Sequence, residues 1–238
     1  MRVLFFILLA LAAPVAAQTF GTENTFNEAV ETARRGDFEQ AAEKFRRVLL
    51  ASEAEKPSND FLARVHFNLG VCFYRLGETE KAVRQLNEAV RLSGRKYQKA
   101  FYVLGMAEQR RGKLDRAEEA FRNALKLDRA DGEAWFDLAM VCLEKTEFEK
   151  AEKAFSNSIK YESRSAADAY NNLGVISALR RDFDTAEKHF ETALELSAGR
   201  SPEARNNLQF CRYYRTANRF EDLLAKLEFK RPDRLEYQ

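Results

Sequence analysis

A short pattern of small and large apolar residues repeats along the middle of this chain. An alanine is followed four positions later by a large apolar residue and three positions after that by a small one. The four sets are Ala82, Leu86 and Ala89; Ala117, Phe121 and Ala124; Ala151, Phe155 and Ser158; and Ala186, Phe190 and Ala193. Their first members are 35, 34 and 35 residues apart. A fixed period of this length is typical of repeat proteins, whose units bury their apolar faces only against neighbouring units.

Each repeat is predicted to form two helices. The spacing of three and four residues places the small and apolar side chains on one face of a second helix, with charged residues elsewhere. The first helix carries a small residue at a constant position: Gly70, Gly105, Ala139 and Gly174. Glycine inside a helix costs about 1 kcal/mol relative to alanine. Its recurrence therefore predicts that the two helices approach closely there, and Gly77 and Gly112 predict the turns between them.

The pattern resembles a known family. The spacing of aromatic, leucine and alanine positions is similar to the tetratricopeptide-repeat consensus in two successive units: Trp135, Leu138, Ala139, Phe148, Ala151 and Phe155, and then Tyr170, Leu173, Gly174, Phe183, Ala186, Phe190 and Ala193. This resemblance implies an all-α fold, a right-handed α-solenoid of stacked antiparallel helix pairs. First helices would line its concave side and second helices its convex side. The family's proline near the end of each unit is missing here.

The resemblance also predicts how the chain is divided. Residues 63–200 hold four units, and residues 18–62 hold a divergent first unit with an extended connection. Residues 201–229 predict a half-matching unit and a capping helix over residues 220–229, followed by a tail at residues 230–238.

The N-terminus has the composition of a secretory signal peptide. Arg2 precedes an unbroken apolar run over residues 3–13, and small residues follow Pro14. The run is shorter than the roughly 20 residues that span a bilayer. We therefore predict a signal peptide at residues 1–17, cleaved after Ala17, and an exported protein, periplasmic or secreted, with no stable membrane insertion afterwards. An uncleaved anchor is the alternative.

The residues that carry catalysis or bind metals do not occur in the usual patterns. His66 and His189 are the only histidines and do not form a metal-binding pair, and the carboxylates recur at helical spacings that favour ion pairs. The sequence predicts no catalytic residue, no metal and no cofactor. The alternative is an enzyme with an unrecognised carboxylate site, and such an enzyme would need a metal or a cofactor. The 39 Lys and Arg residues balance 37 Asp and Glu residues, so no nucleic-acid partner is indicated.

The three cysteines fall in first helices two repeats apart. Two interhelical spacings amount to about 20 Å, whereas a disulfide needs Cα atoms within about 7 Å. We therefore expect Cys72, Cys142 and Cys211 to be buried apolar residues.

A second set of residues on the first helices suggests a binding surface. Aromatic and amide side chains lie on a face separate from the one that packs on the second helix: Phe67, Asn68, Tyr74, Tyr102, Phe136, Asn171, Asn172, Asn206 and Asn207. In the family that the chain resembles, these are groove positions. The aromatic residues are equally compatible with a core between repeats.

Asparagine recurs at one position of this face, at Asn27, Asn68, Asn172 and Asn207, with Asp137 in the fourth slot and Val103 interrupting the series. An amide both donates and accepts, so it can pair twice with the backbone of an extended peptide. The alternative is that these amides bond neighbouring helices or water.

One position before the aromatic face, the charge changes sign along the chain, from Arg64 and Lys99 to Glu133, Asp168 and Glu203. Such a gradient would orient a bound peptide, although chance also explains five residues. The sequence therefore predicts a non-enzymatic scaffold that binds a protein or extended peptide in its groove. The alternative is a structural subunit of a self-assembled complex, such as a homo-oligomer, or of a cell-envelope complex, which assembles through convex or end surfaces.

Overall fold

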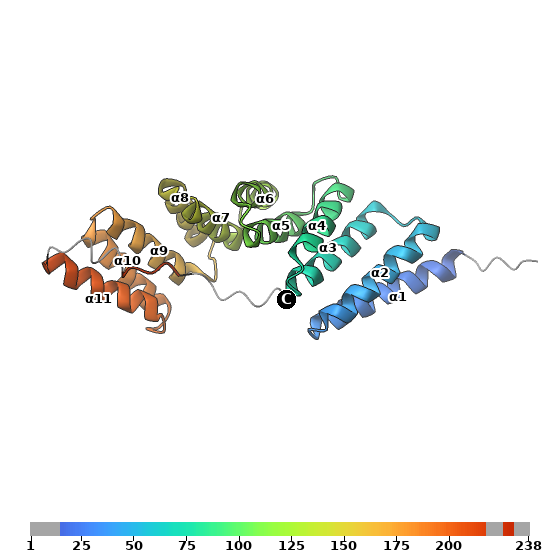
Figure 1. Cartoon of the computed structure of the whole chain (residues 1–238), viewed down its shortest axis with the longest axis horizontal. Coiled ribbons are helices and arrows are strands. Elements are labelled where there is room, and N and C mark those ends of the chain that lie inside the picture. Colours follow the sequence, from blue (N-terminus) through green and yellow to red (C-terminus); the bar gives the residue numbers. More distant parts are fainter. Residues whose placement is uncertain (1–14, 218–225, 231–238) are drawn as a thin grey trace, which may run out of the picture. The chain divides into compact units, whose positions relative to one another are not determined.

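The computed structural model describes residues 15–217 and 226–230. Within them the chain forms eleven α-helices and no strand, joined by short turns (Figure 1). The chain divides into an N-terminal unit that ends at Arg95 and a C-terminal unit that begins at Lys96.

The N-terminal unit contains two helix pairs. They are α1 (Val15–Arg34) with α2 (Phe38–Glu55), and α3 (Asn59–Arg75) with α4 (Thr79–Leu92). Phe26 of α1 is buried and its ring centroid lies 5.7 Å from that of Phe45 and 5.4 Å from that of Phe61. The second pair thus covers an apolar face that the first pair leaves open.

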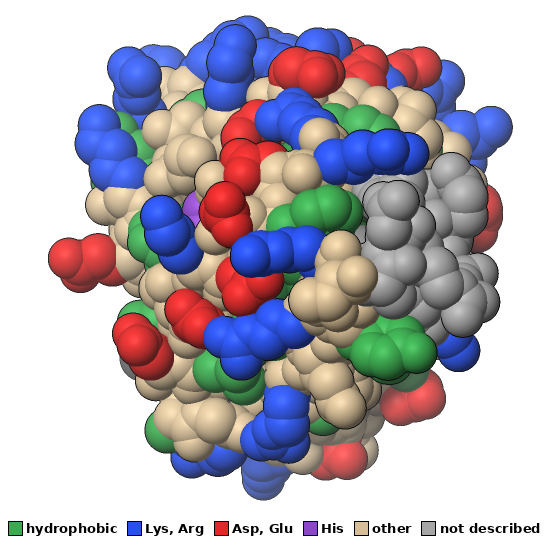
Figure 2. Space-filling view, turned by 90° about the vertical axis from the view of Figure 1, so that its left-hand side faces the viewer, with side chains coloured by type: hydrophobic (Ala, Val, Ile, Leu, Met, Phe, Trp, Pro, Cys, Tyr) green, Lys and Arg blue, Asp and Glu red, His purple; other side chains and the backbone are tan. Residues whose placement is uncertain are grey.

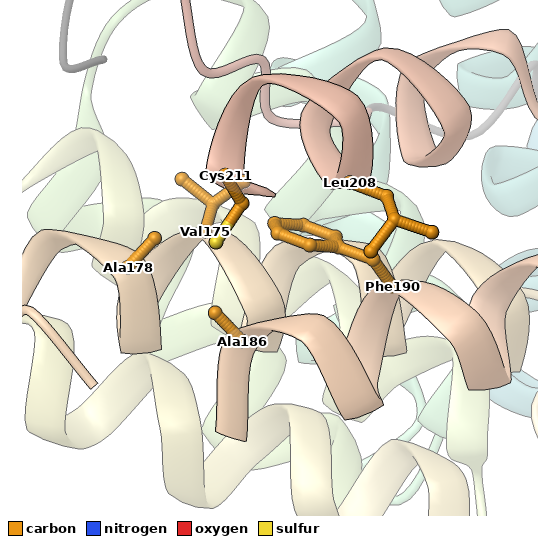
Figure 3. Close-up of a cluster of buried hydrophobic side chains, with 6 residues drawn as sticks. All are labelled: Val175, Ala178, Ala186, Phe190, Leu208 and Cys211. Carbon is orange, nitrogen blue, oxygen red and sulfur yellow. The ribbon is translucent and has the colours of Figure 1, made fainter. Parts of the chain in front are cut away.

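The C-terminal unit continues the same arrangement over seven helices. They are α5 (Gln98–Arg110), α6 (Leu114–Leu127), α7 (Gly132–Glu144), α8 (Phe148–Lys160), α9 (Ala166–Leu179), α10 (Phe183–Leu196) and α11 (Pro202–Ala217). Each helix packs on the next. Figure 3 shows how α11 closes the last pair: Leu208 and Cys211 pack on Val175, Ala178, Ala186 and Phe190. The predicted all-α solenoid of helix pairs is confirmed within each unit.

The small residues of the first helices lie where the sequence predicted a close approach. A Cβ atom on Gly174 would stand 2.5 Å from Cε1 of Phe190, and one on Gly105 would stand 2.8 Å from Cδ1 of Phe121. At Gly70 the nearest atom is Cγ of Leu86, also at 2.8 Å. These distances leave no room for a methyl group, so the glycines set the separation of these three pairs.

The turns inside the helix pairs share one geometry but do not all use glycine. Gly77 and Gly112 adopt φ of 77° and 70°, in the left-handed region that favours glycine. Thr146 and Arg181 hold the same place in later repeats with φ of 58° and 64°. Each turn is closed by a backbone hydrogen bond, such as that from Glu147 N to the carbonyl oxygen of Cys142 at 2.8 Å. A turn closed by this bond can hold a residue other than glycine in the left-handed region. Turns of this kind are not found by looking for glycine in the sequence.

One prediction about the C-terminal end of the chain needs correction. The predicted helix over residues 220–229 is wrong for its last residues, because residues 226–229 are a turn and non-helical chain; residues 218–225 lie outside the described part. The backbone groups of Glu228 bond to asparagine side chains instead of to a helix. The predicted signal peptide lies outside the described residues up to residue 14, and α1 begins at Val15. Among the described helices, none is both long and apolar enough to cross a membrane.

The cysteines are buried, as predicted. Burial raises the pKa of Cys72 to about 12 and the pKa of Cys142 and Cys211 to about 11. A thiol with so high a pKa carries little thiolate at neutral pH and is therefore unreactive.

We predict that Gly174→Ala lowers the free energy of unfolding by about 1–3 kcal/mol, because its methyl group would overlap the buried ring of Phe190. Urea unfolding followed by circular dichroism measures the change. The control is Gly21→Ala in α1, where a Cβ meets nothing within 4 Å and alanine should stabilise the helix. Equal stability of Gly174→Ala and the parent chain would contradict this account of the pair.

Candidate functional site

Three asparagines of the C-terminal unit surround a short piece of the chain's own C-terminal region. Asn171 and Asn172 lie in α9, and Asn207 lies one repeat later in α11. All three side chains are fully buried. We call them the asparagine site, and residues 226–230, which lie against them, the tail segment; this segment can be followed in Figure 1 beside α9.

Two asparagines hold the backbone of the tail segment by paired hydrogen bonds. Asn207 accepts from Glu228 N at Oδ1 (3.0 Å) and donates from Nδ2 to Glu228 O (2.8 Å). Asn172 pairs in the same way with Lys230, accepting from its N–H at 2.7 Å and donating to its oxygen at 2.9 Å. In an extended chain, every second residue presents its N–H and C=O groups on the same edge. Successive repeats can therefore each bind one residue, two positions apart along the strand.

Asn171 orients the two amides that hold the tail segment. Its Oδ1 accepts from Asn207 Nδ2 at 2.9 Å, and its Nδ2 donates to Asn172 Oδ1 at 3.2 Å. The same Nδ2 also donates to Glu228 O at 3.2 Å. A buried amide is costly unless it is bonded. Here each of the three amides finds partners in its neighbours and in the backbone of the tail segment.

Only two side chains of the tail segment are partly buried by the fold. Leu227 packs against the apolar cluster of α9, α10 and α11 that Figure 3 shows. Lys230 donates from Nζ to Glu203 Oε1 at 3.0 Å. The side chains of Lys226, Glu228 and Phe229 are exposed.

The pKa of Glu203 reflects its contact with Lys230. Burial alone would raise the pKa of this carboxyl group. Hydrogen bonds from its own backbone N–H and from Lys230, together with the positive charge of Lys230, lower the pKa overall below its usual value. The carboxylate is therefore charged at neutral pH and attracts a cation at this end of the tail segment.

The interactions of the tail segment nearly balance the cost of ordering it. Five hydrogen bonds join asparagine side chains to its backbone, each worth about 1 kcal/mol net. Partial burial of Leu227 adds about 1 kcal/mol. Fixing five residues costs about 1–2 kcal/mol each. Together with the ion pair between Lys230 and Glu203, the favourable contacts are similar in size to this cost, so the segment is held weakly.

The other predicted site residues do not join this site. Asn206, adjacent to Asn207, is exposed, and so is Lys99. In the N-terminal unit, Asn68 donates to the carbonyl oxygen of Arg64 in its own helix at 2.8 Å, and the guanidinium of Arg64 stacks 4.9 Å from the ring centroid of Phe26. Phe67 and Tyr74 are half-buried in α3.

Two predicted aromatic residues belong to the core. Phe136 is fully buried with its ring centroid 5.3 Å from that of Phe155. Tyr102 is buried beside Phe121 at 5.7 Å and donates from its hydroxyl to Asp137 Oδ2 at 2.7 Å. For these two residues, the core interpretation is the one that the structure supports.

Two acidic residues of the predicted charge gradient, Glu133 and Glu203, make different contacts. Glu133 accepts hydrogen bonds from the hydroxyls of Ser163 and Ser165 and from Arg164 N, so it stabilises the turn before α9. Glu203 contacts the tail segment instead.

A row of ion pairs between repeats was missed by the sequence reading. A basic residue near the C-terminal end of one first helix meets an acid at the start of the previous second helix: Lys145 with Glu118, Arg180 with Glu152, and Arg215 with Glu187. The 35-residue spacing of the basic residues was the available signal. On the face in Figure 2, acidic and basic side chains are interspersed, with no large area of one sign.

One group of possible metal ligands lies near these ion pairs. Glu118, Cys142 and Glu147 bring their ligand atoms within 4.8 Å of one another. Lys145 Nζ already lies 2.6 Å from Glu118 Oε2 and 3.5 Å from Glu147 Oε1. Burial and the nearby carboxylates raise the pKa of Cys142 to about 11. An ammonium group neutralises these acids, so the donor set does not favour a cation.

We predict that Asn207→Ala releases the tail segment, because Glu228 loses both of its bonds to that amide. Hydrogen exchange of the backbone amides of Glu228 and Lys230 should speed up toward the rate of an unprotected chain, since an amide is protected only while its bond is closed. Mass spectrometry of peptic fragments measures this rate. The control, Asn206→Ala, alters the exposed neighbour and should leave the rate unchanged. Unaltered exchange in Asn207→Ala would show that the amide does not hold the segment.

Comparisons with known proteins agree with this architecture. Two family profiles described as tetratricopeptide repeat match the chain, one over residues 23–94 and the other over residues 102–156 and 143–202. No curated protein matches the sequence.

Solved structures give the same result. A crystal structure of MamA is 25% identical with a TM-score of 0.64, covering 71% of this chain and 94% of that one. A structure of pilF from Pseudomonas aeruginosa is 17% identical with a TM-score of 0.66, covering 88% and 89%. YrrB, described as a TPR protein with an unusual peptide-binding site, is 19% identical with a TM-score of 0.62, covering 78% and 95%. With its helix pairs, its constant glycine positions and both profile matches, the chain belongs to the tetratricopeptide-repeat family.

Proposed function

We propose that this protein is a non-enzymatic scaffold that binds an extended segment of a partner protein at the asparagine site. The observation that supports the proposal is the pairing of Asn172 and Asn207 with the backbone of the tail segment. This pairing within one chain is a model for how the two asparagines would bind the backbone of a partner's extended segment.

Backbone pairing explains how one site binds a peptide with limited dependence on its sequence. Every residue except proline offers an N–H and a C=O group. Asn172 and Asn207 present one donor and one acceptor each toward alternate residues of a strand. Once a segment covers the amides, water is excluded and these bonds are strengthened. YrrB is described as having an unusual peptide-binding site, which is consistent with this use of the fold. At 19% sequence identity, the likeness to YrrB is one of fold alone.

The proposed location is outside the cytoplasm, in the periplasm or the external medium. The support is the apolar run of residues 3–13 followed by small residues up to Ala17. Assembly of several copies into a larger structure is the alternative function, and light scattering of the full chain over a range of concentrations tests it.

We predict that Asn172→Ala combined with Asn207→Ala weakens capture of the native partner at least tenfold, because two paired contacts to the partner's backbone are lost. Affinity purification from the native compartment with quantitative mass spectrometry measures capture. The exposed Asn206→Ala variant is the matched control, and circular dichroism checks that both variants are folded. Full capture by the folded double variant would exclude the asparagine site as the binding surface.

We predict that the exported protein begins at Gln18. Expression of residues 1–238 in a Gram-negative host, followed by intact-mass measurement of the periplasmic fraction, should give the mass of residues 18–238. Ala17→Phe replaces the small residue before the cut and should leave the leader attached. An unprocessed parent chain recovered only from the cytosol would contradict the export proposal.

A further inference from the structure

The tail segment indicates which residues of a bound peptide the site can distinguish. Its five side chains fall into two groups: Leu227 and Lys230 are partly buried, and the other three are exposed. A contact that is covered by protein discriminates between side chains, whereas an exposed one scarcely does. Selection should therefore act at two positions, three residues apart.

The first of these positions meets an apolar surface. Leu227 packs against the cluster formed by Val175, Phe190 and their neighbours from α9, α10 and α11. This surface contains ring and aliphatic carbon atoms (Figure 3). A charged side chain placed there would lose its water without gaining a partner.

The second position meets the carboxylate of Glu203. Glu203 and Lys230 are about equally exposed, at 22% and 23% of their side-chain surface, and their charged atoms are 3.0 Å apart. An acidic residue in place of Lys230 would lose this ion pair and bring a second negative charge toward Glu203. The position thus accepts lysine or arginine and rejects aspartate or glutamate.

The tail segment uses the groups that a partner would need. While it is bound, Asn207 Oδ1 is occupied by Glu228 N, and Glu203 is occupied by Lys230. A segment tethered in the same chain acts at a high effective concentration, of the order of millimolar for a short linker. A free peptide therefore has to displace the tail segment before it can bind.

We propose that the asparagine site selects extended segments in which an apolar residue precedes a basic residue by three positions, and that residues 226–230 are a built-in competitor for these segments. The proposal rests on the function proposed above and adds the class of ligand and the competitor.

The test uses the full chain with an opened site. Glu228→Pro together with Lys230→Pro removes both tail N–H groups that bond to Asn207 and Asn172, and leaves every residue of the site intact. A second opened chain, Leu227→Ala with Lys230→Glu, removes the two covered side chains instead. The probe is a fluorescein-labelled peptide with the sequence of residues 225–232, blocked at both ends, and fluorescence polarisation measures its affinity.

We expect the probe to bind both opened chains at least tenfold more tightly than the unmodified chain. On the opened chain, probes carrying the equivalent of Leu227→Ala or Lys230→Glu should lose at least fivefold in affinity. A probe with the equivalent of Glu228→Ala should stay within twofold, because that side chain is exposed. Adding Glu203→Lys to the opened chain should reverse the preference, so that the probe with glutamate binds better than the parent probe.

The outcomes separate the two proposals. Equal affinity of all probes, lost on Asn207→Ala, would overturn the selectivity and leave backbone binding standing. Equal affinity of the opened and unmodified chains would overturn the role of the tail segment as a competitor. Absence of probe binding to either opened chain, with both folded by circular dichroism, would overturn the proposed function as well.

Discussion

In three of the helix pairs, the contact between a glycine of the first helix and a large side chain of the second helix determines how closely the two helices pack. Gly105 faces Phe121 and Gly174 faces Phe190, and in both cases a Cβ atom would overlap the ring. The rings are fully buried, so they have no alternative place to go. Because this contact uses one face of the first helix, the opposite side remains available for other groups. In α9 and α11 that side carries the amides of Asn172 and Asn207.

The asparagine site shows how buried amides become a binding surface. An amide removed from water loses stability unless each of its polar atoms finds a partner. Asn171 supplies some of these partners, but the Oδ1 atom of Asn207 accepts its described hydrogen bond from the backbone of Glu228. The site is therefore complete only when an extended backbone or water lies on it. A strand fits better than water because two residues of a strand advance about 7 Å, close to the roughly 8–10 Å between neighbouring helices.

Most of the fold could be predicted from the sequence because its determinants are local and repeated. The glycine positions and the paired helices follow from residues that lie within one repeat of each other. The asparagine position was also visible as a recurring amide. The docking of the tail segment was not, since it joins Asn172 to Lys230, 58 residues away, and no periodicity connects them. The sequence also could not show whether Phe136 lies in the core or in the groove, because an aromatic residue is expected at either place.

The length of the asparagine site is fixed by the residue that occupies the same position one repeat earlier. Asp137 lies there, and its carboxylate accepts the hydroxyl hydrogen of Tyr102. A carboxylate can accept a backbone N–H but cannot donate to a backbone C=O, so the paired contact cannot continue beyond Asn172 toward α7. In the proposed function, two asparagines would pair with two residues of a bound strand, and the affinity would be modest because few bonds offset the ordering of the peptide. Such a site suits a contact that forms and releases readily, and that a weakly held tail segment of the same chain can replace.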